Sequence, residues 1–131
     1  MQHSAIKNTK VFIVDDMVII RERLRQMLAE IEGVSVVGEA ESQAEAVTGI
    51  TRTDPDVVML DIHLRNNGSG LEVLRALRPG MSGIVFIVLT NFPNPHYRKL
   101  YMEAGASHFF DKHTEFKKIV TVIAALGATH H

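Results

Sequence analysis

The stretch Val11–Ile20, VFIVDDMVII, places a short apolar run directly before two adjacent acids, Asp15 and Asp16. Four consecutive apolar residues are typical of a strand buried on both faces of a parallel sheet. After the acids, apolar residues recur with the period of a helix, at Ile20, Leu24, Met27, Leu28 and Ile31. The stretch therefore predicts a strand–helix unit with two carboxylates at the carboxyl end of its strand.

Four further apolar runs have the length of strands, at residues 34–37, 56–61, 84–90 and 108–112. Helical patterns separate and follow them. The helix signals are a capping box of Ser42 and Glu45, the segment SGLEVLRAL, Asn94 with Pro95 and a terminal Gly105, and Thr114 before a helix that continues to about Leu126. Strand–helix alternation repeated five times predicts right-handed crossovers and a doubly wound (βα)5 three-layer α/β sandwich.

The length of 131 residues and an apolar share of 46% suit one domain with a sizeable core. We expect an N-terminal extension over 1–8, the domain over 9–126 and a tail over 127–131. The last two residues, His130 and His131, are either native or the remnant of a purification tag, and they carry no functional interpretation.

Charge and cysteine content limit the partners. The net charge of −1 provides no broad basic field, so we expect no direct binding to nucleic acid or to a membrane surface. There is no cysteine, no signal-peptide pattern and no apolar run of about 18 residues. A cytoplasmic location is the expectation.

Polar residues end four of the five predicted strands. They are Asp15 and Asp16, Asp61, Thr90 and Lys112. Taken singly, each has an ordinary structural explanation as a helix cap, a turn residue or a solvated side chain. In an open parallel sheet, however, the carboxyl ends of the strands form one rim where ligands bind. We therefore expect these five side chains to form one site.

The chemistry of this group points to a hard cation and a phosphoryl group. Carboxylates about 5 Å apart repel by roughly 3 kcal/mol per pair at an effective dielectric near 20, so a cation must lie among them. Oxygen ligands without His or Cys favour Mg²⁺, which binds one or two carboxylates together with phosphate oxygens. Lys112 and Thr90 would then contact the transferring oxygens, and one carboxylate would be the nucleophile.

The pattern of DD after the first strand, PDVVMLD, IVFIVLT and FFDK resembles response-regulator receiver domains over about residues 9–126. The resemblance implies a flavodoxin-like fold with strand order 2-1-3-4-5. It also implies that Asp61 is phosphorylated by a histidine kinase or a histidine phosphotransfer protein. Phosphorylation would change the surface of the fourth helix, fifth strand and fifth helix, which would then control a partner, an output domain or a dimer.

The resemblance also implies residue roles. Asp16, Asp61 and the backbone carbonyl of His63 would bind Mg²⁺, or Mn²⁺ as a substitute, and Asp15 would act mainly through a metal-bound water. Thr90 and Lys112 would contact the phosphoryl oxygens. Phe109 occupies the family's aromatic switch position, which leaves Phe110 as the expected core residue of that pair. Tyr97, Leu100, Tyr101 and Ala104 form a helical stripe that we interpret as packing.

The loop after Asp61 departs from the family pattern. Arg65 stands in place of proline, and Gly70 lies one residue further from Asp61 than is usual. The family's Lys-Pro step is Lys112-His113 here, so we expect a trans peptide. Bulky side chains near the phosphate can hinder water, so we hypothesise that His63, Asn91 and Phe92 tune the phosphoryl lifetime.

Two alternative functions stay open from the sequence. A degenerate receiver would bind partners without phosphorylation. A phosphohydrolase of the haloacid-dehalogenase type would use similar residues, but it requires Asp-x-Asp on the first strand, whereas the acids here are adjacent. We expect a signalling module that catalyses its own phosphoryl transfer and its loss, and that turns over no external substrate.

Overall fold

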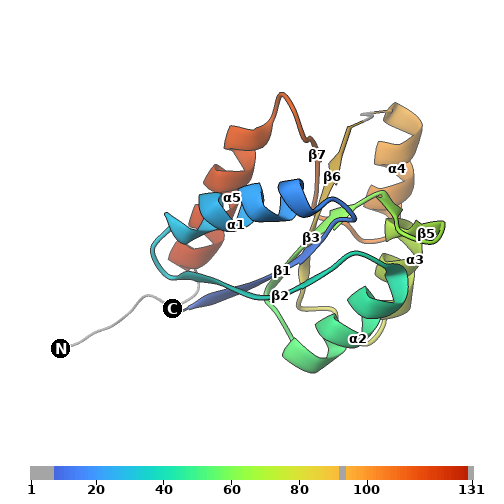
Figure 1. Cartoon of the computed structure of the whole chain (residues 1–131), viewed down its shortest axis with the longest axis horizontal. Helices are drawn as coiled ribbons and strands as arrows, with labels where there is room; N and C mark the ends of the chain where they lie inside the picture. The colour runs from blue at the N-terminus through green and yellow to red at the C-terminus, as the bar shows by residue number, and fades with distance from the viewer. Residues whose placement is uncertain (1–7, 92–93, 130–131) are drawn as a thin grey trace.

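The computed structural model describes residues 8–91 and 94–129. Its main sheet has five parallel strands in the order β2-β1-β3-β6-β7 (Figure 1). Their bounds are β1 Thr9–Val14, β2 Val34–Ala40, β3 Val57–Asp61, β6 Val85–Thr90 and β7 His108–Asp111. Two short additional strands lie outside this sheet, so the order is the expected 2-1-3-4-5. The predicted flavodoxin-like fold is confirmed.

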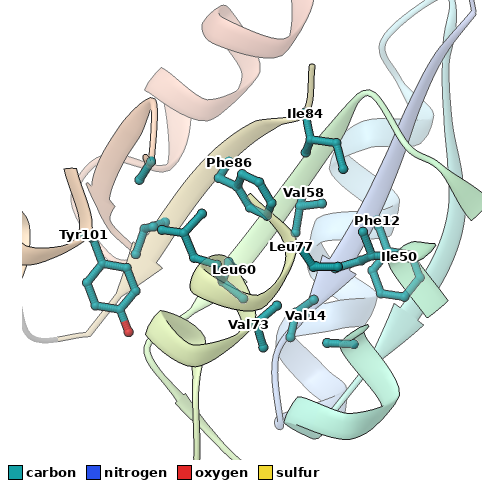
Figure 2. Close-up of a cluster of buried hydrophobic side chains, with 14 of the residues drawn as sticks. Phe12, Val14, Ile50, Val58, Leu60, Val73, Leu77, Ile84, Phe86 and Tyr101 are labelled. Carbon is teal, nitrogen blue, oxygen red and sulfur yellow. The ribbon is translucent and has the colours of Figure 1, made fainter. Parts of the chain in front are cut away.

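Helices cover both faces of the sheet (Figure 1). The buried side chains of α1 Val18–Ala29 and α5 Phe116–Thr129 pack on one face with strand residues such as Ile13 and Met59. On the other face, α2 Gln43–Thr53, α3 Gly70–Leu77 and α4 Pro95–Glu103 pack against Phe12, Leu60 and Phe86 (Figure 2). Every residue of β3 is buried, which explains why its sequence is apolar without alternation.

The helix ends agree in part with the capping signals. Ser42 accepts a hydrogen bond from the amide of Glu45, whose carboxylate accepts from the amide of Glu41, one residue earlier than in a standard capping box. Asn94 caps α4 as predicted, with Pro95 as the first helical residue. Within the described residues there is no cis peptide bond, so Lys112-His113 is trans as expected.

The prediction for the start of the last helix was wrong. Thr114 does not cap α5, which begins at Phe116 and ends at Thr129 rather than near Leu126. Asp111 Oδ1 accepts hydrogen bonds from the amides of His113 and Thr114, at 2.7 and 3.2 Å. This local turn holds the segment out of the helix and delays its first turn.

A hairpin after Asp61 was not predicted. Strands β4 His63–Leu64 and β5 Gly68–Ser69 pair antiparallel, and the amide of Gly68 donates to the carbonyl of Arg65 at 3.1 Å. The two central turn residues, Asn66 and Asn67, have φ values of 61° and 59°. Positive φ at both positions is the property of a type I′ turn, and asparagine tolerates it better than most residues.

The hairpin is fixed to the segment before α2. Arg65 donates its amide to the carbonyl of Glu41 and its guanidinium to the carboxylate of Glu41, both at 3.0 Å. The amide of Ser69 donates to the side chain of Gln43 at 3.3 Å. The loop that the sequence marked as irregular is therefore an ordered hairpin with contacts to a neighbouring connection. Across the residues that the structure describes, no helix is both long and apolar enough to cross a bilayer.

Candidate functional site

The five predicted rim residues lie together at the carboxyl ends of the strands. Asp15 follows β1, Asp61 ends β3, Thr90 ends β6 and Lys112 follows β7, and all four are buried. Asp16 is half-buried beside them. Carboxylate oxygens of Asp15, Asp16 and Asp61 lie within 4.8 Å of one another. The predicted convergence of these residues is confirmed, and their chemical roles stay predictions.

Lys112 crosses the sheet from its edge to neutralise this acid group. Its ammonium lies 2.6 Å from Asp15 Oδ2 and 3.0 Å from Asp61 Oδ2, and its side chain is 4% exposed. Its backbone amide donates to the carbonyl of Thr90 at 2.8 Å, which fixes the end of β7 against β6. Burial disfavours the ammonium, but Asp61 and Asp15 outweigh it and raise the pKa of Lys112. Lys112 is therefore charged at neutral pH.

The carboxyl group of Asp61 has a raised pKa. Burial and the nearby charge of Asp15 raise the pKa of Asp61 to about 6, against the opposing effects of Lys112 and the amide of Ile62. Asp61 Oδ1 accepts a hydrogen bond from the Ile62 amide at 2.7 Å, and Oδ2 faces Lys112. The ionised carboxylate is thus oriented by two donors, but they do not fully offset the cost of burying its charge. A further cation beside Asp61 would therefore lower the energy of the ionised form.

Arg21 supports the acid pair and was not identified from the sequence. Its guanidinium donates to the backbone carbonyl of Asp15 at 2.6 Å and pairs with Glu39 at 3.1 Å. Asp15 Oδ1 in turn accepts from the amide of Met17 at 2.9 Å. Its position six residues after Asp15 was the available signal, but its pairing with Glu39 depends on tertiary structure.

Gly70 also has a role that the sequence did not reveal. A Cβ atom at this position would lie 2.1 Å from the backbone oxygen of Asp61, a distance that real side chains do not reach. The amide of Gly70 donates to the carbonyl of Ile62 at 2.9 Å. The start of α3 therefore packs directly on the backbone of the predicted phosphoacceptor, and only glycine fits this contact.

Two of the remaining predicted residues, His63 and Asn91, lie just beyond the ends of β3 and β6. His63 is exposed and starts β4, with its ring 6.4 Å from the ring of Tyr97 in an edge arrangement. Asn91 is exposed directly after β6, and Phe92 lies outside the described residues. Binding of Mg²⁺ by the backbone carbonyl of His63 stays a prediction.

The assignment of the two phenylalanines in β7 needs a correction. Phe109 is the deeply buried member, 4% exposed, and packs in the cluster with Tyr101 at a ring distance of 6.1 Å. Phe110 is half-buried on the opposite face and stacks on His108. Alternation along the strand was right, but the order of burial was reversed. Tyr101 is buried in the core, so its interpretation as packing is confirmed.

The donor set fits a hard divalent cation. Three carboxylates supply oxygen ligands only, and their charge exceeds what Lys112 neutralises. Mg²⁺ prefers such oxygen ligands and retains waters beside one or two carboxylates. A buried carboxylate, a hydroxyl and an ammonium beside such an ion can position and neutralise a transferring phosphoryl group.

The sequence profile of the response regulator receiver domain matches residues 11–124. The chain belongs to this family. Response regulator GacA of Pseudomonas aeruginosa is 32% identical over 119 residues, and DevR/DosR of Mycobacterium tuberculosis, a DNA-binding transcriptional activator, is 33% identical over 119 residues. Each alignment covers 91% of this chain, but only 55% and 54% of the relative. This receiver domain therefore spans about half the length of these relatives.

Solved receiver structures agree with the fold. A LuxR-family two-component response regulator from Aurantimonas sp. SI85-9A1 superposes with a TM-score of 0.85 at 28% identity, covering 95% of this chain and 89% of that one. The isolated receiver domain of RcsB from Salmonella enterica serovar Typhimurium, solved in the presence of the phosphomimetic BeF3⁻, gives a TM-score of 0.84 at 25% identity. It covers 94% of this chain and 91% of that one.

Proposed function

We propose that this receiver domain accepts a phosphoryl group on Asp61 from a histidine kinase or a histidine phosphotransfer protein. The observation that carries the proposal is the buried carboxylate of Asp61, which lies within 4.8 Å of two other acids and 3.0 Å from Lys112. A carboxylate placed among groups of both signs can act as a nucleophile toward phosphorus, and the ammonium of Lys112 can stabilise the negative charge of the product.

The transfer needs one bond made and one broken. A carboxylate oxygen of Asp61 attacks the phosphorus of the donor phosphohistidine and forms the O–P bond. The N–P bond breaks, and its electron pair stays on the ring nitrogen, so a ring protonated on its other nitrogen leaves as neutral imidazole. Asp15, Asp16 and Asp61 would hold Mg²⁺, which supplies positive charge to the phosphoryl oxygens when it is bound.

Other side chains assist from fixed positions. Lys112 contributes its ammonium from the end of β7, and Thr90 contributes its hydroxyl from the end of β6. The product adds a charge of about −1.5 to −2 and three acceptor oxygens to the rim. We propose that Thr90 and Phe109 respond to this charge and alter the surface formed by α4, β7 and α5.

The proposed output acts through a surface of this domain that binds a partner. We propose that the α4-β7-α5 surface controls a downstream protein, an output domain or a second receiver, as the domain itself carries no basic field for nucleic acid. The relative DevR/DosR is named a DNA-binding activator, and this chain matches about half of it. This relation supports a DNA-binding output that is linked to the receiver or recruited by it.

The direct test is phosphorylation by a small donor. Acetyl phosphate with Mg²⁺ should raise the intact mass by one phosphoryl group, and EDTA should prevent this gain. Asp61→Asn should abolish it, while Asp54→Asn, which removes an exposed carboxylate at the end of α2, should not. A wild-type protein without mass gain would favour the degenerate receiver. Continuous hydrolysis of a phosphomonoester would favour a phosphohydrolase.

A further inference from the structure

Both backbone polar groups of Asp15 are held by the end of β2. The amide of Asp15 donates to the carbonyl of Ala40 at 3.0 Å. The carbonyl of Asp15 accepts from a guanidinium nitrogen of Arg21 at 2.6 Å. The Nε atom of Arg21 in turn lies 3.1 Å from a carboxylate oxygen of Glu39, the residue before Ala40. These contacts form a closed ring from Asp15 through Arg21 and back along β2.

The carbonyl that Arg21 binds belongs to the peptide unit that joins the two acids. A peptide unit is planar, so fixing its oxygen also fixes the direction in which the chain continues to Asp16. The carboxylate of Asp15 is fixed separately, by the amide of Met17 at 2.9 Å and by the ammonium of Lys112 at 2.6 Å. Among the described residues, no hydrogen bond or ion pair holds the carboxylate of Asp16. Arg21 therefore constrains Asp16 through the backbone.

The candidate cation site depends on this constraint because its ligands come from two separate segments. The carboxylate oxygens of Asp15 and Asp16, after β1, lie within 4.8 Å of one another and of Asp61, at the end of β3. A loosely held Asp16 would have to be ordered each time a cation binds, and the lost entropy weakens binding. Groups that orient metal ligands typically change metal affinity by about 10- to 100-fold when they are removed.

Glu39 anchors Arg21 and also pairs with a second arginine. One carboxylate oxygen of Glu39 lies 3.1 Å from Arg21, and the other lies 2.8 Å from Arg25. The side chain of Arg21 is 14% exposed, whereas that of Arg25 is 50% exposed. An ion pair with so exposed an arginine contributes little, so Arg25 offers a control that carries the same charge and pairs with the same acid.

We propose that Arg21 is a positioning residue that sets the divalent-cation affinity of the site through the carbonyl of Asp15, with Glu39 as its anchor. The inference rests on the cation that the proposed function requires. Arg21 is itself a cation near the acids, so its charge alone repels Mg²⁺, and its removal would strengthen Mg²⁺ binding. A positioning role has the opposite sign, because removal of Arg21 then weakens Mg²⁺ binding.

The test is a titration of the ¹⁵N-labelled protein with MgCl₂, followed by amide chemical shifts, with no phosphoryl donor present. Arg21→Met keeps the apolar stem and removes the donors, so its dissociation constant for Mg²⁺ should rise about tenfold. Arg21→Lys keeps the charge, but its single nitrogen cannot serve both acceptors, so the constant should rise at least about threefold. A pure charge effect would instead lower the constant in Arg21→Met and leave it unchanged in Arg21→Lys.

Matched variants separate the role of Arg21 from that of any surface arginine. Arg25→Met and Arg75→Met each remove an exposed guanidinium that pairs with an acid, and both should bind Mg²⁺ within about twofold of wild type. Glu39→Ala leaves Arg21 without its anchor and should also weaken Mg²⁺ binding. The double variant of Glu39→Ala with Arg21→Met should bind no more weakly than Arg21→Met alone, since both break the same path of contacts.

The outcomes distinguish this inference from the proposed function. Wild-type protein without Mg²⁺-dependent shifts near Asp16 and Asp61 would overturn the proposed metal site and this inference with it. Wild-type protein that binds Mg²⁺ but gains no mass from acetyl phosphate would overturn the proposed phosphoryl transfer alone. Equal or tighter Mg²⁺ binding by Arg21→Met would overturn the inference alone, and with a lowered melting temperature it would show that Arg21 serves only stability.

Discussion

Removing the charge of Asp61 should stabilise this receiver domain when no divalent cation is present. Burial and the charge of Asp15 raise the pKa of this carboxyl from 3.8 to about 6. Since one pKa unit corresponds to about 1.4 kcal/mol, ionised Asp61 destabilises the folded state by about 3 kcal/mol relative to the neutral acid. Asparagine has nearly the same shape without the charge, so Asp61→Asn should raise the free energy of unfolding by about 3 kcal/mol at pH 8.

The pH dependence follows from the direction of that change. A folded-state pKa above the unfolded value means that the folded protein binds the proton more tightly. The stability from protonated Asp61 is therefore fully present below about pH 4 and is lost as pH rises through 6. The advantage of Asp61→Asn over wild type should shrink from about 3 kcal/mol at pH 8 to about 1.5 kcal/mol at pH 5.

Urea unfolding followed by far-ultraviolet circular dichroism in EDTA measures both values. Asp54→Asn is the matched control, because it removes an exposed carboxylate at the left-handed C-cap of α2, where asparagine is equally tolerated. It should change stability by less than about 0.5 kcal/mol at either pH. Coincident curves for wild type and Asp61→Asn at pH 8, or a gap that does not narrow at pH 5, would refute the reasoning.

Substitutions at three further positions, with one control position, test the site and its hairpin. Gly70→Ala should lower the free energy of unfolding by about 1–3 kcal/mol and reduce phosphorylation by acetyl phosphate, because its Cβ would collide with the Asp61 carbonyl. Gly80→Ala, which has open space, should do neither in the same urea and mass measurements. Lys112→Ala should lose about 3–5 kcal/mol in EDTA by leaving buried acids unpaired, and Mg²⁺ should raise its melting temperature more than that of wild type; an equal rise in both would contradict this. Asn67→Gly should stabilise the hairpin turn and Asn67→Ala should destabilise it, each by about 1 kcal/mol in urea unfolding, since φ is 59° there; the opposite order would exclude a type I′ turn.

The fold and the rim were predictable because each depends on local sequence. Buried strands such as β3 are continuously apolar and end at a polar residue, so Asp61 and Thr90 mark both the strand ends and the site. Lys112 directly follows β7, a shorter strand that ends at Asp111. Parallel strands place all these ends at one edge, so that no knowledge of long-range contacts was needed.

Errors arose where short-range hydrogen bonds compete with a simpler pattern. Threonine is a common helix cap, but the amide of Thr114 donates to the carboxylate of Asp111 in a local turn. The helix therefore begins at Phe116. The hairpin has strands of only two residues, too short for an apolar period, although Asn66 and Asn67 carry the turn signal. The burial of Phe109 and Phe110 could not be read from alternation, because alternation places the two rings on opposite faces without saying which is more deeply buried.

The contacts that fix Asp61 also determine which neighbouring elements a displacement of Asp61 would move. One route leads along the strands, because the amide of Lys112 is bonded to the carbonyl of Thr90 while its ammonium is bonded to Asp61. The other leads through Gly70, which packs on the backbone oxygen of Asp61 at the start of α3. The first route reaches β7, where the ring of Phe109 lies 6.1 Å from that of Tyr101 in α4. A new charge at the rim would therefore act on β7 from its carboxyl end and on α3 from its first turn.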